Sequence, residues 1–271
     1  MTADATGRRA FRVAYDGGAY RGFQRQPDVP TVSDAILDGL RALGVLEDVP
    51  PGYAAAGRTD AGVSATAQTV AFDAPDWLDP AALNSELPAD VRAWAHADVP
   101  ADFHATHDAS EREYTYYLHA PAAEDDRARR ALTTLAGRHD FHNLTPDDDG
   151  TVRDLAAEVA RDGPFLVFEL RADGFPRQLV RRLVRAVELV ARGEADLAWV
   201  DRLLGEAAVE GPDGVGPAPA EPLVLTAVDY PGVEFQADES AAASARAVFA
   251  ERRATFAARA AVSGRLVADL E

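Results

Sequence analysis

The 271-residue sequence contains no cysteine and no lysine. Without cysteine, the chain can form no disulfide, supply no thiolate to a metal and use no thiol nucleophile. No apolar run approaches the roughly 18 to 20 residues that a membrane-spanning helix needs. Residues 1–9 lack the apolar core of a secretory signal. These absences predict a soluble, cytoplasmic protein without a membrane segment.

The charge balance is strongly acidic. All 27 basic residues are arginine, and 45 acidic residues give a formal net charge of -18. The acids are scattered along the chain and not gathered in one tail. This favours a GC-rich genome combined with a surface adapted to high intracellular salt, over an acidic protein that binds cations or basic partners. At molar salt, an RNA-binding protein gains little from counterion release. Arginine suits such conditions, because its planar fork can bind phosphate through two hydrogen bonds and stack on bases.

Hydrophobic periodicity predicts one order of elements twice. In the first hundred residues, strands are expected at 11–16, 53–56, 68–72 and 91–99, and helices at 32–43 and 79–87. In the second half, strands are expected at 113–119, 153–161, 165–171 and 223–230, and helices at 127–136, 177–192 and, as an insertion, 197–204. Thr31 with Asp34, and Asp79 before Pro80, are typical of helix starts.

Two β-α-β-β-α-β units in tandem predict an α+β fold. The expected architecture is two ferredoxin-like subdomains whose antiparallel sheets join, with an active-site cleft between them. The predicted divisions are residues 1–103, residues 104–234 and a helical extension at 235–271. The extension is rich in alanine, and it could pack on the core or against a partner.

The candidate catalytic residues lie in residues 56–63, Ala-Gly-Arg-Thr-Asp-Ala-Gly-Val. Gly57 and Gly62 permit a tight loop that can approach a ligand closely. Arg58 and Asp60 are two residues apart, so in an irregular loop their side chains can converge on one site. A carboxylate in a cleft can act as a nucleophile or stabilise positive charge at a sugar carbon. The same residues also fit a common Asp-Ala-Gly turn with a surface ion pair.

Residues 56–63 closely resemble the catalytic signature of the tRNA pseudouridine synthase A family. Other segments resemble that family in the same order over about residues 10–231: residues 15–17, 22–26, 102–105, 112–116, 175–185, 220–223 and 227–230. The sequence departs from the family pattern at three places. Phe23 stands where tryptophan is often found, Ser64 follows the signature in place of histidine, and Arg177-Gln178 replaces a histidine pair.

The resemblance implies an enzyme that isomerises uridine to pseudouridine at positions 38, 39 or 40 of the tRNA anticodon stem-loop, as a homodimer. It implies that Asp60 is the catalytic carboxylate at C1′ of the uridine. It further implies that Arg58 contacts the nucleic acid and helps to flip the base, and that Tyr114 stacks on the uracil. Arg181 would pair with Asp60 across the subdomains, and Leu223 would line the base pocket.

The implied reaction flips the base out of its stack. It needs a carboxylate, an aromatic surface and a dry pocket, but no cofactor and no metal. Together with the acidic composition, the resemblance points to a halophilic archaeon.

Several alternatives remain open. A non-catalytic RNA-binding protein could also be built from two ferredoxin-like modules, although the Gly-Phe-rich aromatic signature of such modules is missing. The pairs His104/His107 and His139/His142 have a spacing that can bind zinc, but neither pair lies in a predicted helix. A glycosidase would need a second carboxylate at a fixed distance, and no motif singles one out.

Two sets of residues, one of arginines and one of tyrosines, can each be interpreted in two ways. Arg177, Arg181 and Arg185 have i, i+4 spacing, which fits either a solvated helix face or a stripe facing RNA. Strand alternation places Tyr114 and Tyr116 on one face and residue 117 on the other, so at least one of the three tyrosines belongs to ordinary core.

Overall fold

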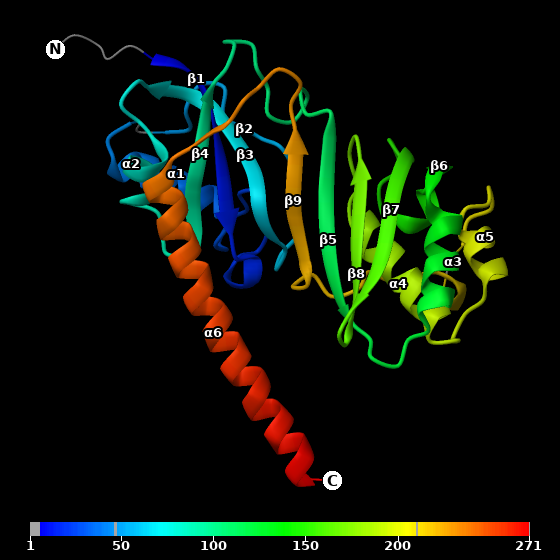
Figure 1. Ribbon diagram of the computed structural model, residues 1–271. Coiled ribbons are helices and arrows are strands. Elements are labelled where there is room, and N and C mark those ends of the chain that lie inside the picture. Colours follow the sequence, from blue (N-terminus) through cyan, green and yellow to red (C-terminus); the bar gives the residue numbers. More distant parts are fainter. Residues whose placement is uncertain (1–5, 46–47, 210, 271) are drawn as a thin grey trace.

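The computed structural model describes residues 6–45, 48–209 and 211–270. A single large sheet runs through the molecule, and helices pack against it (Figure 1). The predicted α+β class is confirmed. Among the described helices, none is long and apolar enough to cross a membrane.

The N-terminal half of the sheet carries two main helices. Its elements are β1 (Thr6–Tyr15), η1 (Gly17–Ala19), α1 (Val32–Ala42), β2 (Ala54–Ala55), β3 (Ser64–Pro75), α2 (Pro80–Asn84) and β4 (Val91–Asp98). The strands lie in the order β4-β1-β3-β2, and every neighbouring pair is antiparallel. Both predicted helix starts are present. The Thr31 side chain accepts a hydrogen bond from the Asp34 N–H, and the Asp79 side chain accepts one from the Ala82 N–H.

The C-terminal half repeats this arrangement with an additional strand. Its elements are β5 (Glu111–His119), α3 (Asp125–Leu135), β6 (Gly137–Asp140), η2 (His142–Leu144), β7 (Val152–Asp162), β8 (Phe165–Ala172), α4 (Leu179–Ala191), α5 (Leu197–Leu203), η3 (Gly211–Asp213) and β9 (Leu223–Asp229). The order β9-β5-β8-β7 is antiparallel throughout. The short strand β6, which periodicity did not predict, pairs with β7. Helix α4 begins two residues later than predicted, because Gln178 has a left-handed backbone.

Strand β9 joins the two halves. It is antiparallel to β5 on one side, and on the other it pairs in parallel with β3. The parallel pairing is short, placing Ser64 opposite Val224 and Ala65 opposite Leu225. Since the signature segment 56–63 directly precedes β3, this pairing positions it at the junction between the halves.

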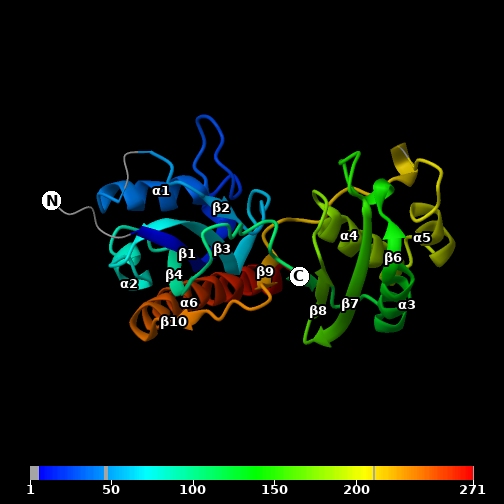
Figure 2. The same cartoon turned by 90° about the horizontal axis from the view of Figure 1, so that it is seen from above.

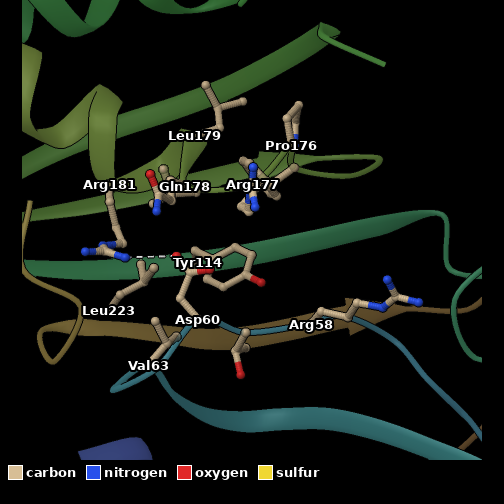
Figure 3. Close-up of a pocket in the computed structure, with 13 residues that line it drawn as sticks. Arg58, Asp60, Val63, Tyr114, Pro176, Arg177, Gln178, Leu179, Arg181 and Leu223 are labelled. Atoms are coloured by element: carbon tan, nitrogen blue, oxygen red, sulfur yellow. Dashed lines mark hydrogen bonds and ion pairs between the residues drawn. The ribbon is translucent and has the colours of Figure 1, made fainter. Parts of the chain in front are cut away.

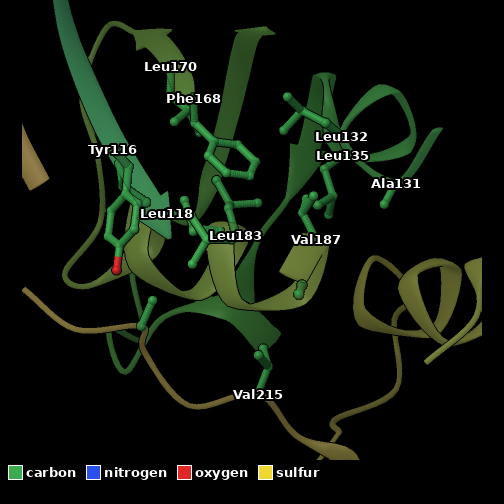
Figure 4. Close-up of a cluster of buried hydrophobic side chains, with 14 of the residues drawn as sticks. Tyr116, Leu118, Ala131, Leu132, Leu135, Phe168, Leu170, Leu183, Val187 and Val215 are labelled. Carbon is green, nitrogen blue, oxygen red and sulfur yellow. The ribbon is translucent and has the colours of Figure 1, made fainter. Parts of the chain in front are cut away.

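Each half has its own apolar core. In the N-terminal core, α1 packs Ile36, Leu37 and Leu40 against the stacked rings of Phe11 and Phe72. The C-terminal core gathers side chains of β5, β8, α3 and α4, as Figure 4 shows for Tyr116, Phe168, Leu132, Leu183 and Val187. Tyr114 packs against both cores, at the junction between the halves.

The C-terminal segment returns to the N-terminal half. Strand β10 (Gln236–Ala237) pairs with β4, and α6 (Glu239–Leu270) follows it. Ala241 and Ala245 are buried, whereas every residue from 253 to 270 is exposed. Figure 2 shows α1 and α6 on opposite sides of the N-terminal sheet, and Figure 1 shows α6 extending beyond the strand ends. The start of α6 therefore packs on the core, and its second half is exposed along its whole length.

Candidate active site

A pocket lies at the junction between the halves, where residues 56–63, the signature loop, face the start of α4 (Figure 3). It is lined by Arg58, Thr59, Asp60, Val63, Tyr114, Phe175, Pro176, Arg177, Gln178, Leu179, Val180, Arg181 and Leu223. All five residues that the sequence analysis assigned to the site line this pocket. They come from both halves of the chain.

An ion pair connects the two halves across the pocket. Arg181 Nη1 donates a hydrogen bond to Asp60 Oδ2 at 2.9 Å (Figure 3). The Arg181 side chain is 15% exposed and the Asp60 side chain 27% exposed, so water screens the pair only partly. Arg181 is itself oriented, because its Nε donates to the Ala218 carbonyl at 2.7 Å and its own carbonyl accepts from the Ala218 N–H at 3.0 Å. The carboxylate therefore has a fixed direction.

Gly17 and Gly22, in the segment that follows β1, bring their backbone into close contact with the signature loop. A Cβ atom on Gly17 would lie 2.1 Å from the carbonyl oxygen of Val63. A Cβ atom on Gly22, whose φ is +101°, would lie 2.9 Å from the carbonyl oxygen of Thr59. The same Thr59 carbonyl accepts a hydrogen bond from the Phe23 N–H at 3.1 Å. Only glycine allows this close approach of backbone to backbone.

Buried polar side chains hold the loop from the sheet side. Gln68 Nε2 donates to the Gly57 carbonyl at 2.9 Å, and the Tyr15 hydroxyl lies 2.7 Å from Thr59 Oγ1. Arg112 Nε and Nη2 donate to the Ala56 carbonyl at 3.1 and 2.9 Å. Sequence reasoning missed the supporting roles of Gln68 and Arg112. The available signal was a glutamine two residues before the apolar run at residues 70–72 of the same strand, since a buried amide must find partners.

Tyr114 forms an aromatic wall of the pocket. Its ring packs edge-on against Phe175, with centroids 5.2 Å apart and an interplanar angle of 89°. The residue is partly exposed overall, but its hydroxyl end points inward, close enough that a Cβ on Gly57 would lie 3.8 Å from it. Burial raises the pKa of Tyr114 to about 12; Arg112 opposes this rise and Asp60 adds to it. The phenol is therefore neutral near pH 7.

The apolar floor of the pocket is closed to water. Val63, Leu179 and Leu223 are 2%, 1% and 4% exposed. The described residues contain no group of three or more His, Cys, Asp or Glu side chains arranged to hold a metal ion. The pocket thus offers one carboxylate, one aromatic face and an apolar floor.

Arg58 differs from its sequence expectation. Its side chain is exposed and points away from Asp60 (Figure 3), so the two do not converge. The partner of Asp60 is Arg181, which comes from the other half of the chain. Arg58 instead lies at the edge of the pocket.

Of the row Arg177, Arg181 and Arg185, only the last two lie on α4. Arg177 precedes the helix, and its Nε lies 3.4 Å from Asp147 Oδ1. Arg185 pairs within the helix with Glu188 at 2.7 Å. Only Arg181 faces the carboxylate. The three tyrosines divide as expected, with Tyr116 buried and Tyr117 46% exposed.

Comparison with known proteins identifies relatives along nearly the whole chain. A family model described as tRNA pseudouridine synthase matches residues 131–231. The chain is 62% identical over 259 residues to tRNA pseudouridine synthase A of Haloarcula marismortui, covering 91% of this chain and 94% of that protein. It is 61% identical over 262 residues to tRNA pseudouridine synthase A of Natronomonas pharaonis, covering 95% and 98%.

A more distant relative has the same description. The tRNA pseudouridine synthase A of Thermococcus kodakarensis is 38% identical over 263 residues, covering 94% of this chain and 97% of that protein. Among solved structures, the crystal structure of a Cbf5-Nop10-Gar1 complex matches with a TM-score of 0.39 and 12% identity, covering 80% of this chain and 49% of that chain. That structural likeness is too weak to place individual residues.

Proposed function

The chain belongs to the tRNA pseudouridine synthase A family, and from that premise we propose that it modifies uridines at positions 38 to 40 of the tRNA anticodon stem-loop. Family membership makes it an enzyme that isomerises uridine to pseudouridine in tRNA, so the alternative of a non-catalytic RNA-binding protein is set aside. Its high-identity relatives come from halophilic archaea, in agreement with the acidic, lysine-free composition.

The observation that carries the mechanism is the Asp60–Arg181 pair inside an apolar pocket. The target base leaves its stack and enters the pocket. Asp60 then acts at C1′, either by attack or by stabilising positive charge, as the C1′–N1 bond breaks and uracil takes the bonding electrons. The base rotates and its C5 bonds to C1′, which displaces the Asp60 carboxylate in the route by attack. The C5 proton is then lost and N1 gains a proton. Product and substrate therefore have the same composition.

Each lining residue has a role in this proposal. Arg181 orients the carboxylate and balances its charge where water is scarce. Tyr114 gives the uracil a flat surface, and base–aromatic stacking contributes about 1–3 kcal/mol per base. Leu223 closes the pocket, which keeps the detached uracil from escaping. Arg58 lies at the edge, where its exposed guanidinium can contact RNA and assist flipping.

The proposal extends to the architecture. We propose that residues 1–103 and 104–234 are two ferredoxin-like units and that 235–271 is an added helical segment. The order β4-β1-β3-β2, repeated as β9-β5-β8-β7, supports this division. We also propose a cytoplasmic homodimer that holds one tRNA with both subunits. The exposed apolar side chains on the second half of α6 supply a surface for a second copy.

A single-turnover assay on tRNA transcripts tests the catalytic role. Asp60→Ala should abolish pseudouridine formation while tRNA binding persists. Asp98→Ala, which removes an exposed carboxylate of β4 that pairs with Arg9 of β1, is the matched control and should retain the wild-type rate. Equal rates for Asp60→Ala and wild type would contradict the mechanism.

Mapping pseudouridine in tRNA from a strain lacking this gene tests the target. Loss should be confined to positions 38 to 40. An unchanged map, or loss in another arm of the tRNA, would refute the proposed target.

A further inference from the structure

Gln178, which lines the pocket, is unfavourable at its position in two respects. Its backbone is left-handed, with φ 62° and ψ 3°, and among the described non-glycine residues only Asp28 also has positive φ. It occupies the N-cap position of α4 without a capping hydrogen bond from its side chain. Glycine would relieve the backbone, and Ser, Thr, Asp or Asn would cap the helix. The fold alone does not explain a glutamine here, and such exceptions concentrate at functional sites.

The backbone on both sides of Gln178 is fixed. The Arg177 N–H donates to Asp147 Oδ2 at 2.7 Å, and the Arg177 carbonyl accepts from Thr145 Oγ1 at 3.0 Å. The Gln178 carbonyl accepts from the Arg182 N–H at 3.0 Å. The backbone is therefore held by its surroundings in a conformation with a strained φ at residue 178.

The amide of Gln178 is oriented with its donor free. Oε1 accepts from Arg182 Nη2 at 3.4 Å. Within residues 6–45, 48–209 and 211–270, no acceptor is hydrogen-bonded to Nε2. Figure 3 shows Gln178 beside Arg181, on the wall that faces Asp60 and Tyr114. The pocket is thus lined by an N–H donor that nothing in the protein satisfies.

We propose that Gln178 determines specificity, donating its amide N–H to a carbonyl oxygen of the flipped uracil. This inference rests on the proposed function. Uracil carries carbonyl oxygens on both sides of N3–H, whereas cytosine has an amino group in place of O4, and an amino group would face this donor with another donor. A site built to hydrogen-bond one group discriminates against the analogue that lacks it.

The same donor fits the base before and after it rotates. For C5 to replace N1 at C1′, uracil turns about the axis through N3 and C6, and this exchanges the positions of O2 and O4. One fixed N–H therefore meets a carbonyl oxygen in both orientations. Cytosine would present its amino group in one of them. Gln178 can thus retain the detached uracil through the step in which no covalent bond holds it.

Three variants separate the side chain from the strained backbone. Gln178→Gly and Gln178→Asn tolerate the left-handed backbone, while Gln178→Glu keeps the shape and loses the N–H donor. We expect kcat/KM to fall about 10- to 100-fold for Gln178→Gly and Gln178→Glu, through kcat, with KM for whole tRNA within about 2-fold of wild type. Gln178→Asn, one methylene shorter, should recover only part of the loss.

Thio-substituted substrates test the contact itself. Transcripts carry uridine, 2-thiouridine or 4-thiouridine at one target position. Because the donor meets one carbonyl before the rotation and the other after it, sulfur at either position should slow the wild type about 10-fold. Neither substitution should slow Gln178→Gly relative to its own rate on uridine, because that variant has no donor to lose. Sulfur effects of equal size in both proteins, or wild-type kcat/KM for Gln178→Gly, would overturn the inference.

The outcome stays interpretable if a variant is unstable. Should Gln178→Gly fail to fold, equal wild-type rates on all three transcripts would still overturn the inference. Failure of the proposed function is a different result, because the wild type would then form no pseudouridine with any transcript. If only this inference fails, the wild type still forms pseudouridine, but the rate does not depend on the side chain at residue 178.

Discussion

At the scale of single residues, Arg181 is the side chain on which the pocket depends most. It supplies the ion partner of Asp60 and is aligned by two hydrogen bonds with Ala218. We expect Arg181→Met to lower the single-turnover rate about 100-fold or more, because the carboxylate loses its orientation. The unfolding free energy should fall by about 1–2 kcal/mol, since the pair is partly exposed. Arg185→Met, whose partner is Glu188, is the control and should retain the rate.

Tyr114 offers a second test at the residue scale. Tyr114→Phe keeps the ring and should stay within about 3-fold of the wild-type kcat/KM. Tyr114→Ala removes the stacking surface and should lose about 5- to 150-fold, which corresponds to about 1–3 kcal/mol. Steady-state kinetics on one tRNA transcript would compare them. Equal losses in the two variants would assign the contribution to the hydroxyl and remove stacking as the role of Tyr114.

The same tyrosine predicts a pH dependence of stability. Its pKa is about 12 in the folded protein, mainly through burial, against about 10 in an unfolded chain. Because folding raises this pKa, the contribution of neutral Tyr114 to the unfolding free energy is fully present below pH 10 and is lost as pH rises towards 12. When urea unfolding is measured from about pH 9 to 11, the unfolding free energy of Tyr114→Phe should therefore fall less with rising pH than that of the wild type. Parallel curves for the two proteins would contradict this.

At the scale of elements, the signature loop is shaped by the segment that follows β1. Gly17→Ala would place a Cβ 2.1 Å from the Val63 carbonyl, so the loop must move. We expect a large drop in kcat, with about 1–3 kcal/mol of lost stability measured by thermal unfolding. Gly7→Ala in β1 meets nothing within 4 Å and should behave as wild type in both assays.

Elements with strong periodicity could be predicted from sequence, and exceptions arise where backbone geometry is special. The Thr31 and Asp79 caps fixed two helix starts. The start of α4 could not be predicted, because a left-handed Gln178 has no signature in an apolar pattern. Strand β6 is four residues long and has no alternation that distinguishes it from a loop. The direction of Arg58 depends on the clasped loop, which spacing alone does not determine.

At the scale of the whole molecule, the site exists only when both halves are together. Asp60 comes from the N-terminal half, while Tyr114, Arg181 and Leu223 come from the C-terminal half. Composition and spacing could not bring these residues into one pocket. The family resemblance did so, because it matched segments of both halves in order. The supporting hydrogen bonds of Gln68 and Arg112 depend on tertiary contacts over 11 and 56 residues, which a single sequence does not reveal.

The second half of α6 predicts how two copies associate. Phe256, Ala260, Ser263, Val267 and Leu270 continue the buried face of the helix, with i, i+4, i+7, i+11 and i+14 spacing. Phe256 and Leu270 each lie seven residues from Ser263, so two antiparallel helices that cross at Ser263 would place Phe256 opposite Leu270 of the second copy. Such self-complementarity is what a two-fold interface requires. Phe256 and Val267 are 52% and 59% exposed in the single chain, which leaves apolar area to bury.

We therefore expect Phe256→Ser combined with Val267→Ser to convert a dimer to a monomer, measured by light scattering in about 2 M KCl, because high salt screens charges while apolar burial persists. Val262→Ser, on another face of the same helix and 62% exposed, is the control and should remain dimeric. A double variant that stays dimeric would place the interface on another surface. If the monomer forms and its KM for tRNA rises while single-turnover chemistry at saturation is unchanged, the second copy contributes to holding the RNA and not to the reaction at Asp60.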